Sequence, residues 1–251
     1  MRISYCLNYL DNNMQIYLIN LDKDTDRLAA ADAQLRKYGI EYSRESACYA
    51  KELPETERMS HVNQFRWWCV VGRKIEMGEI GCAVSHYRIM QRMVKQKIPF
   101  VCILEDDVII RPNFKKSINK VEKWINPSLP QVVLLSNHTD EPEEVDEIKA
   151  VNRGVCTEAY ILTLAAAKAL LKANYPICTQ CDRWERWSKL GVIQLYLSTP
   201  SPCCQNFEGF VSNMEGGFKF VCDMNIIEKT LHKSKRAVGK TIDMILCALG
   251  K

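Results

Sequence analysis

The chain has 251 residues, of which 47% are hydrophobic and 25% charged, with 34 basic and 30 acidic side chains. This balance is typical of a globular protein, and it excludes a disordered chain, a collagen-like repeat and a coiled coil. No apolar run approaches the ~18 residues of a membrane-spanning helix, and asparagines and an aspartate interrupt the N-terminus, so we expect no signal peptide and a cytoplasmic protein.

The first elements predict a strand, a helix and a second strand, after an N-terminal extension over residues 1–14. Residues 15–21 form a short apolar run typical of a buried strand. Apolar residues recur at helical spacing over 27–38, Gly39 supplies a stop signal, and 40–46 is the second strand. This order indicates a parallel sheet at the start of a domain that extends over 15–210.

The rest of that domain continues the α/β pattern. Residues 47–78 have no regular period, whereas apolar residues at helical spacing follow from Glu79 to Val94. Further strands are expected over 100–104, 132–135, 154–164 and 192–197, with a helix over 165–173. The expected fold class is therefore α/β, with a mostly parallel central sheet flanked by helices.

The net charge of +4 lies in residues 225–251, which belong to a C-terminal tail that we define as residues 211–251. Within it, residues 225–251 hold six basic and two acidic side chains, so the remainder of the chain is neutral. Apolar residues at helical spacing beside these charges predict an amphipathic basic helix. It would either lie on an anionic membrane surface, such as the inner face of the plasma membrane, or pack on the protein body. The absence of aromatic residues among these charges argues against a nucleic-acid partner.

Twelve cysteines would suggest disulfides in a secreted chain, but in a cytoplasmic chain of this size we expect reduced, mostly buried thiols. A metal-like spacing occurs at Cys178 and Cys181, followed by the adjacent pair Cys203 and Cys204. Adjacent cysteines wrap poorly around one ion. Packing is therefore the favoured interpretation, and zinc binding by these four residues stays open.

The segment ILEDDVI over residues 103–109 is the sharpest chemical feature. Glu105, Asp106 and Asp107 leave a buried strand at the edge where α/β proteins bind ligands. Three close carboxylates repel one another unless a cation or hydrogen-bond donors are present. Mg²⁺ or Mn²⁺, held by one or two carboxylates and phosphate oxygens, fits this pattern. The alternative is a solvated acidic turn, which the apolar residues immediately after it disfavour.

The segment GEIGCAVSH over residues 78–86 opens the helix that precedes this strand. A helix N-terminus attracts anions, and glycines allow a ligand to approach the backbone. Ser85 and His86 can hydrogen-bond a phosphate or a sugar hydroxyl. A buried, hydrogen-bonded histidine is an equally good interpretation of His86, because it shares a helical face with apolar residues.

Together with IYLINLD over residues 16–22 and Arg27, these two segments resemble glycosyltransferase family 25. This group comprises lipooligosaccharide galactosyltransferases and collagen galactosyltransferase domains, and the resemblance spans residues 15–205. It implies a GT-A-like fold, a UDP-sugar donor (UDP-galactose) and inversion at the anomeric carbon with Mn²⁺ or Mg²⁺. The implied acceptor is an oligosaccharide or lipid-linked glycan of lipopolysaccharide or lipooligosaccharide synthesis.

The resemblance also implies roles for individual residues. The metal would be held by Asp107 and Asp106, and Glu105 would reach the ribose. The other donor-binding residues would be Asn20, Arg27, Ser85 and His86.

Inversion requires a base that takes the proton of the acceptor hydroxyl. Asp182, which falls where the family places an aspartate before its final strand, is the first candidate, and Glu158 and Glu185 follow. Trp184 and Trp187 could stack on a sugar ring or belong to the core.

Two other functions are compatible with the same carboxylates. One is a Mg²⁺-dependent phosphohydrolase or phosphotransferase, which would need Asp106 or Asp107 as nucleophile and for which no lysine partner is evident. The other is a non-catalytic nucleotide-sugar-binding protein.

Overall fold

The computed structural model describes residues 14–137, 145–155, 157–206, 237–239, 241 and 245. Of the N-terminal extension, only Met14 is described. Of the C-terminal tail, only residues 237–239, 241 and 245 are described. Within the described ranges, no helix combines the length and apolar character that crossing a membrane would require.

A seven-stranded sheet forms the centre of the molecule, in the strand order β2-β1-β3-β7-β5-β8-β6, and a separate two-stranded sheet pairs β4 with β9. The strands are β1 (Gln15–Asn20), β2 (Ser43–Ser46), β3 (Phe100–Glu105), β4 (Val108–Ile110), β5 (Gln131–Leu134), β6 (Glu147–Ala150), β7 (Ala159–Thr163), β8 (Gln194–Thr199) and β9 (Cys203–Gln205). The helices are α1 (Thr25–Lys37), α2 (Glu55–Ser60), α3 (Gln64–Val71), α4 (Met77–Gln96), α5 (Phe114–Trp124), α6 (Leu164–Asn174) and α7 (Trp184–Lys189).

The strand directions make the sheet mixed but mostly parallel. Strand β1 is parallel to both β2 and β3, and β5 is parallel to β8. Strand β7 runs antiparallel between β3 and β5, and β6 is antiparallel to β8 at the edge. The prediction of an α/β fold with a mostly parallel sheet flanked by helices is therefore confirmed.

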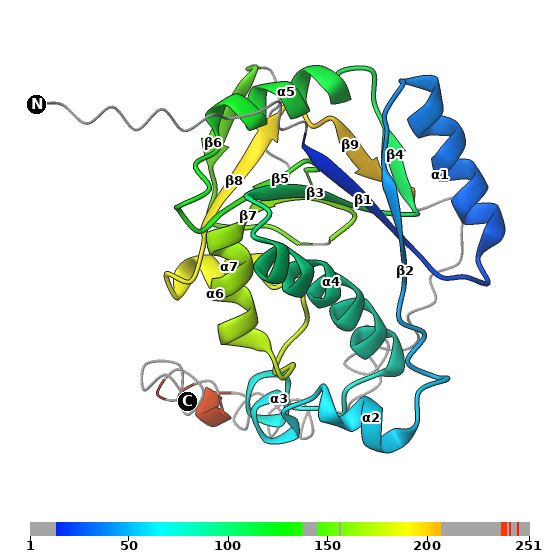
Figure 1. The fold of residues 1–251 in the computed structure, drawn as a ribbon. Helices are drawn as coiled ribbons and strands as arrows, with labels where there is room; N and C mark the ends of the chain where they lie inside the picture. The colour runs from blue at the N-terminus through cyan, green and yellow to red at the C-terminus, as the bar shows by residue number, and fades with distance from the viewer. Residues whose placement is uncertain are drawn as a thin grey trace, which may run out of the picture.

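Helices cover both faces of the sheet (Figure 1). Successive side chains of a strand point to opposite faces, and β3 shows this directly, because Val101 and Ile103 join one apolar cluster while Cys102 and Leu104 join the other. The first cluster includes residues of α3, α4, α6 and α7, and the second includes residues of α1 and α5. The sheet is thus packed between two apolar cores, one on each face.

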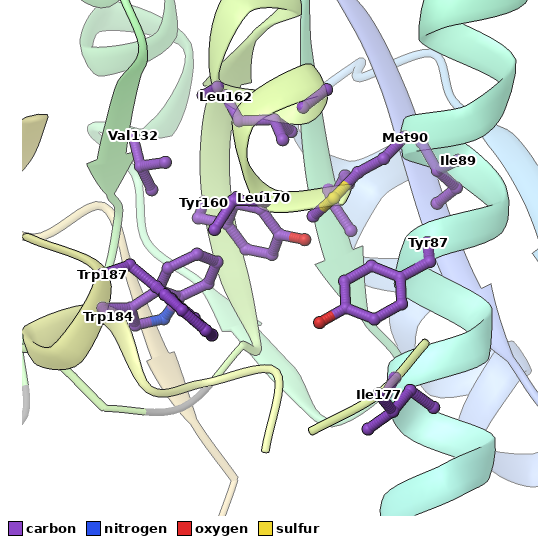
Figure 2. Close-up of a cluster of buried hydrophobic side chains, with 14 of the residues drawn as sticks. Tyr87, Ile89, Met90, Val132, Tyr160, Leu162, Leu170, Ile177, Trp184 and Trp187 are labelled. Carbon is purple, nitrogen blue, oxygen red and sulfur yellow. The ribbon is translucent and has the colours of Figure 1, made fainter. Parts of the chain in front are cut away.

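Trp184 and Trp187 belong to the first core (Figure 2). Both side chains are almost fully buried, and the ring centroids of Tyr160 and Trp184 are 4.9 Å apart. Of the two interpretations of this tryptophan pair, core packing is the one that the structure supports, because neither indole ring faces solvent where a sugar could stack on it.

Several elements differ from the sequence expectation. The apparently irregular stretch over 47–78 contains α2 and α3, and α5 was not expected at all. The strand expected over 154–164 begins only at Ala159, so Thr157 and Glu158 precede it instead of lying within it.

The strand directions bring distant polar residues to one edge of the sheet. The parallel strands β1 and β3 end there with Asn20 and Glu105. The antiparallel strand β7 starts at the same edge, where the Glu105 amide donates to the Glu158 carbonyl over 2.8 Å. Strand β9 pairs with β4 just beyond Asp107, and the Asn206 amide donates to the Asp107 carbonyl over 2.8 Å.

Candidate functional site

A cleft of about 410 Å³ opens at this edge of the sheet. That volume is within the range of roughly 300–1,000 Å³ usual for small-ligand sites. The segment from β1 to α1, the loop after β2, the start of α4, the acidic turn after β3 and the segment before α7 all contribute to its walls. Nine of the proposed site residues line it: Asn20, Arg27, Ser85, His86, Glu105, Asp106, Asp107, Glu158 and Asp182. Glu185 is not among the lining residues.

Asp106 is held by its neighbours on β1 and α1. Its carboxylate accepts a 2.7 Å hydrogen bond from the Asn20 amide and forms a close ion pair with Arg27. Burial raises the pKa of Asp106, and the bonds from Asn20 and Arg27 only partly oppose that rise. Asp106 therefore belongs to a buried ion pair that ties the acidic turn to α1, which leaves it less free than Asp107 to hold a metal.

The ion pair between Arg27 and Asp106 predicts the effect of replacing the arginine. Replacing Arg27 with Met leaves the Asp106 charge buried without its ion-pair partner, which costs about 3–5 kcal/mol of the free energy of unfolding. Urea unfolding measures it. The double variant Arg27→Met/Asp106→Asn, which removes both charges, should recover most of the loss. Equal urea midpoints for the single and double variants would show that Arg27 does not compensate Asp106.

Asp107 lines the cleft and has one carboxylate oxygen without a hydrogen-bond partner. Its Oδ2 atom accepts a 3.1 Å hydrogen bond from Gln205 and lies 3.5 Å from Arg27, whereas Oδ1 is buried with no hydrogen-bond partner. Burial and the charge of Glu105 raise the pKa of Asp107 to about 6. A buried acceptor without a partner is costly. A cation, or a donor group of a ligand, would satisfy it.

The three carboxylates do not gather their oxygens at one point. Among the described residues, the one group of three potential ligand atoms within 4.8 Å of one another is that of Cys82, His86 and Cys181. A hard divalent ion at the acidic turn would thus rely on Asp107 and on oxygens of the bound phosphates, as Mg²⁺ sites commonly do. The donor set fits that manner of binding.

His86 connects α4 to the acidic turn. One ring nitrogen, Nε2, lies 3.0 Å from Glu105 Oε1, and Nδ1 lies 2.8 Å from the Tyr160 hydroxyl. Burial lowers the pKa of His86, but the hydrogen bonds and charges of Cys82 and Glu105 outweigh it and raise the pKa to about 10. Burial raises the pKa of Glu105, but His86 and Thr157 outweigh that effect and lower it. His86 is thus a buried, hydrogen-bonded side chain that also lines the cleft.

Side chains of the protein itself cap the N-terminus of α4. Glu76 and Glu79 form a reciprocal capping box there, and Glu79 also pairs with Arg73. The backbone amides of Glu76 and Glu79 thus already have a carboxylate partner. Ser85 likewise has two partners, because its hydroxyl donates to the Gly81 carbonyl over 2.7 Å and accepts from the Cys48 amide over 2.8 Å.

The close approach of the Cys48 backbone to α4 explains why residue 81 is a glycine. A Cβ at that position would lie 2.4 Å from the Cys48 carbonyl oxygen, which real Cβ atoms do not approach so closely. The missing side chain lets α4 contact the backbone after β2, and this contact forms one wall of the cleft.

The three candidate bases have different surroundings. Asp182 is partly buried and lines the cleft from the segment before α7. Glu158 also lines it, but its side chain is buried and accepts a very short hydrogen bond from Ser136. Glu185 pairs with Lys189 one turn along α7, and its side chain is 44% exposed. The geometry thus favours Asp182 as the accessible carboxylate of the cleft.

The sequence motifs did not reveal three residues that support the acidic turn. Gln205 contacts Asp107 from β9, and Thr157 and Tyr160 contact Glu105 and His86 from the start of β7. Each belongs to a segment more than 50 positions from its partner. The only available signal was the apolar run at 159–162, which predicted a strand but not its neighbours.

The chain is similar to known glycosyltransferases. A family model described as glycosyltransferase family 25 (LPS biosynthesis protein) matches residues 13–184. A Bos taurus protein named probable inactive glycosyltransferase 25 family member 3 is 32% identical over 42% of this chain and 19% of its own. Procollagen galactosyltransferase 1-A of Xenopus laevis is 25% identical over 64% of this chain and 28% of its own.

A solved structure of a glycosyltransferase involved in glycosylation of the major capsid of PBCV-1 is also similar. It aligns with a TM-score of 0.35 and 14% identity, over 74% of this chain and 81% of that chain. The chain spans less than a third of the length of the two curated relatives described above, at 19% and 28%.

Proposed function

The chain belongs to glycosyltransferase family 25, and on that basis we propose that it transfers a hexose from a UDP-sugar to a glycan acceptor, with inversion at the anomeric carbon. The observation that carries the proposal is Asp107, whose buried Oδ1 has no partner in a cleft that also contains Arg27 and Asp182. Galactose is the proposed sugar, because a Xenopus laevis relative is named a procollagen galactosyltransferase.

Mn²⁺ or Mg²⁺ is the proposed cofactor, held by Asp107 and by phosphate oxygens of the donor. Bound there, the ion would stabilise the charge of the leaving diphosphate as a Lewis acid. Asp106 would position the acidic turn through Arg27 and Asn20, and Arg27 would offer a positive charge to the phosphates. His86 would hold Glu105 toward the ribose.

Asp182 is the proposed base. It would accept the proton of the acceptor hydroxyl as that oxygen attacks the anomeric carbon from the face opposite the diphosphate. The proposed acceptor is an oligosaccharide or lipid-linked glycan of lipopolysaccharide or lipooligosaccharide synthesis, a role that matches the description of the family model.

The experiment is a panel of nucleotide sugars incubated with the full chain, with and without Mn²⁺ or Mg²⁺, and with coupled detection of the nucleoside diphosphate. We expect UDP release with UDP-galactose, and we expect chelation of the metal to abolish it. Release of UMP and a sugar 1-phosphate in place of UDP would instead indicate the phosphohydrolase. Turnover that is unchanged by a chelator would contradict the metal-dependent mechanism.

One comparison favours a second candidate, a non-catalytic nucleotide-sugar-binding protein. The Bos taurus relative is named probable inactive. Acceptor-dependent release of UDP separates the two functions. A binding protein binds the donor in a calorimetric titration but releases no UDP when oligosaccharide acceptors are added.

Membrane association through residues 225–251 is a further part of the proposal, and these residues lie almost entirely outside the described ranges. Their basic and apolar residues would lie on an anionic surface. Deleting them should lower binding to phosphatidylglycerol-containing vesicles and leave turnover of a soluble acceptor unchanged. Vesicle binding that survives the deletion would favour a tail packed on the protein body.

A further inference from the structure

Two thiols and an imidazole meet in the wall of the cleft, beside Glu105 of the acidic turn. Cys82 and His86 lie one turn apart on α4, and Cys181 comes from the segment between α6 and α7. The two sulfur atoms are 3.4 Å apart, and one ligand atom from each of the three residues lies within 4.8 Å of the other two. Neither cysteine residue is fully buried, and both line the cleft.

We propose that Cys82, His86 and Cys181 form a binding site for a thiophilic divalent cation of the zinc type. This site is separate from the proposed Mn²⁺ or Mg²⁺ position at Asp107, and it does not depend on the proposed transferase activity. Sulfur and imidazole ligands select zinc-like ions, whereas Mg²⁺ and Mn²⁺ prefer oxygen.

The spacing of the ligands suits a tetrahedral ion. With Zn–S bonds of about 2.3 Å, two thiolates of one tetrahedral site lie roughly 3.8 Å apart, close to the observed 3.4 Å between Cys82 and Cys181. Three protein ligands leave a fourth position, and the cleft supplies the space for water or a ligand atom there. Two thiolates and one divalent ion are neutral together, so the occupied site adds no net charge to a half-buried wall.

His86 has the surroundings of a metal ligand. A histidine that binds a metal through one ring nitrogen usually donates from the other to a carboxylate or another acceptor, which fixes the ring. Both ring nitrogens of His86 already have such partners, Glu105 on one side and the Tyr160 hydroxyl on the other. Whichever nitrogen turns to the ion, the other retains a partner that orients the imidazole.

The site would join two separate parts of the cleft wall. Cys82 and His86 belong to a long helix, whereas Cys181 immediately precedes Asp182 in the chain. An ion bound by all three would fix the position of Asp182 relative to α4. The expected consequence is a more stable segment between α6 and α7.

The test uses the purified full chain, kept reduced with a phosphine and freed of metal, and Co²⁺ as the spectroscopic probe. We expect one equivalent of Co²⁺ to produce a thiolate-to-cobalt charge-transfer band that Zn²⁺ then removes by displacement. Cys82→Ser and Cys181→Ser should each weaken binding by at least ~100-fold, since even the loss of an outer-shell partner costs about 10–100-fold. The matched control is Cys204→Ser, which replaces another partly exposed cysteine that is not in the group and should retain the band.

Thermal unfolding supplies a second measurement that does not depend on the spectrum. Zn²⁺ should raise the Tm of the wild type and of Cys204→Ser, because a ligand that binds the folded state stabilises it. It should leave the Tm of Cys181→Ser unchanged. The proposal is overturned if the wild type shows no thiolate–cobalt band, or if the band and the Tm shift persist in the double variant Cys82→Ser/Cys181→Ser.

Discussion

Replacing Asp107 with Asn is expected to remove most of the metal-dependent release of UDP while leaving the fold at least as stable as the wild type. Turnover should fall by roughly 10²–10³-fold, the loss typical when one electrostatic stabiliser of a reacting group is removed. Asn keeps the size of the side chain but loses the charge that would hold the ion. Initial rates with UDP-galactose at saturating Mn²⁺, together with calorimetric titration of the metal, measure both effects.

The stability of this variant follows from the surroundings of Asp107. Its carboxylate is buried beside Glu105 and Asp106, and its pKa is raised to about 6 from an ordinary value of 3.8. The folded metal-free protein thus binds a proton more tightly than the unfolded chain does, so the ionised carboxylate lowers the stability above about pH 6. Asn carries no such charge, and its amide replaces an acceptor that has no partner.

The raised pKa of Asp107 also predicts how the stability difference between the wild type and Asp107→Asn changes with pH. In the metal-free wild type, the contribution of Asp107 to the free energy of unfolding should increase as the pH falls from about 6 to about 4. The Asn variant lacks that contribution, so the difference in stability between the two proteins should shrink over the same interval. Urea unfolding at several pH values measures that difference, in which titrating groups remote from Asp107 cancel.

Asp146→Asn is the matched control. Asp146 pairs with Lys116 and Lys120, and it does not line the cleft. Its replacement should leave turnover and metal binding unchanged. If instead Asp107→Asn turns over donor within a few-fold of the wild type while metal is bound, the ion is held by other residues and the proposed role of Asp107 is wrong.

The proximity of two site residues follows directly from the parallel strands that the sequence predicted. Asn20 and Glu105 end two apolar runs, and the carboxyl ends of neighbouring parallel strands lie at one edge of a sheet. Their proximity could therefore be inferred without coordinates. The direct bond from Asn20 to Asp106 follows from the same register.

The part that was not predicted depends on strand direction and on contacts between distant segments. An apolar run reads the same whether its strand is parallel or antiparallel, so the sequence did not show that β7 starts at the cleft and brings Glu158 there. The contact of Gln205 with Asp107 spans 98 positions and has no local signal.

The cysteines show how spacing can mislead. Cys178 and Cys181 are three positions apart, but the Cys178 thiol bonds to Asn174 in the core, whereas Cys181 meets Cys82. The spacing of Cys82 and His86, four positions apart on one helical face, was the more informative pattern. The described cysteines are all free.

Replacing Asp182 with Asn should lower kcat by about 10²–10⁴-fold, the range for loss of a general base. Asp182 has no expected contact with the diphosphate, so the affinity for UDP-galactose should stay within a few-fold of that of the wild type. Acceptor-dependent turnover and a calorimetric titration with donor separate these two quantities. Glu185→Gln is the control, because Glu185 pairs with Lys189 outside the cleft and should change neither.

Glu158 is the alternative candidate for the base. Its carboxylate also lines the cleft, but it is buried and bonded to Ser136, so Glu158→Gln should lower stability as well as turnover. A base must give up its proton after each cycle, and the partly exposed Asp182 can exchange it with solvent more readily than a carboxylate enclosed at the start of β7. Should Glu158→Gln retain the wild-type Tm and lose acceptor-dependent turnover while Asp182→Asn stays active, the role of base belongs to Glu158.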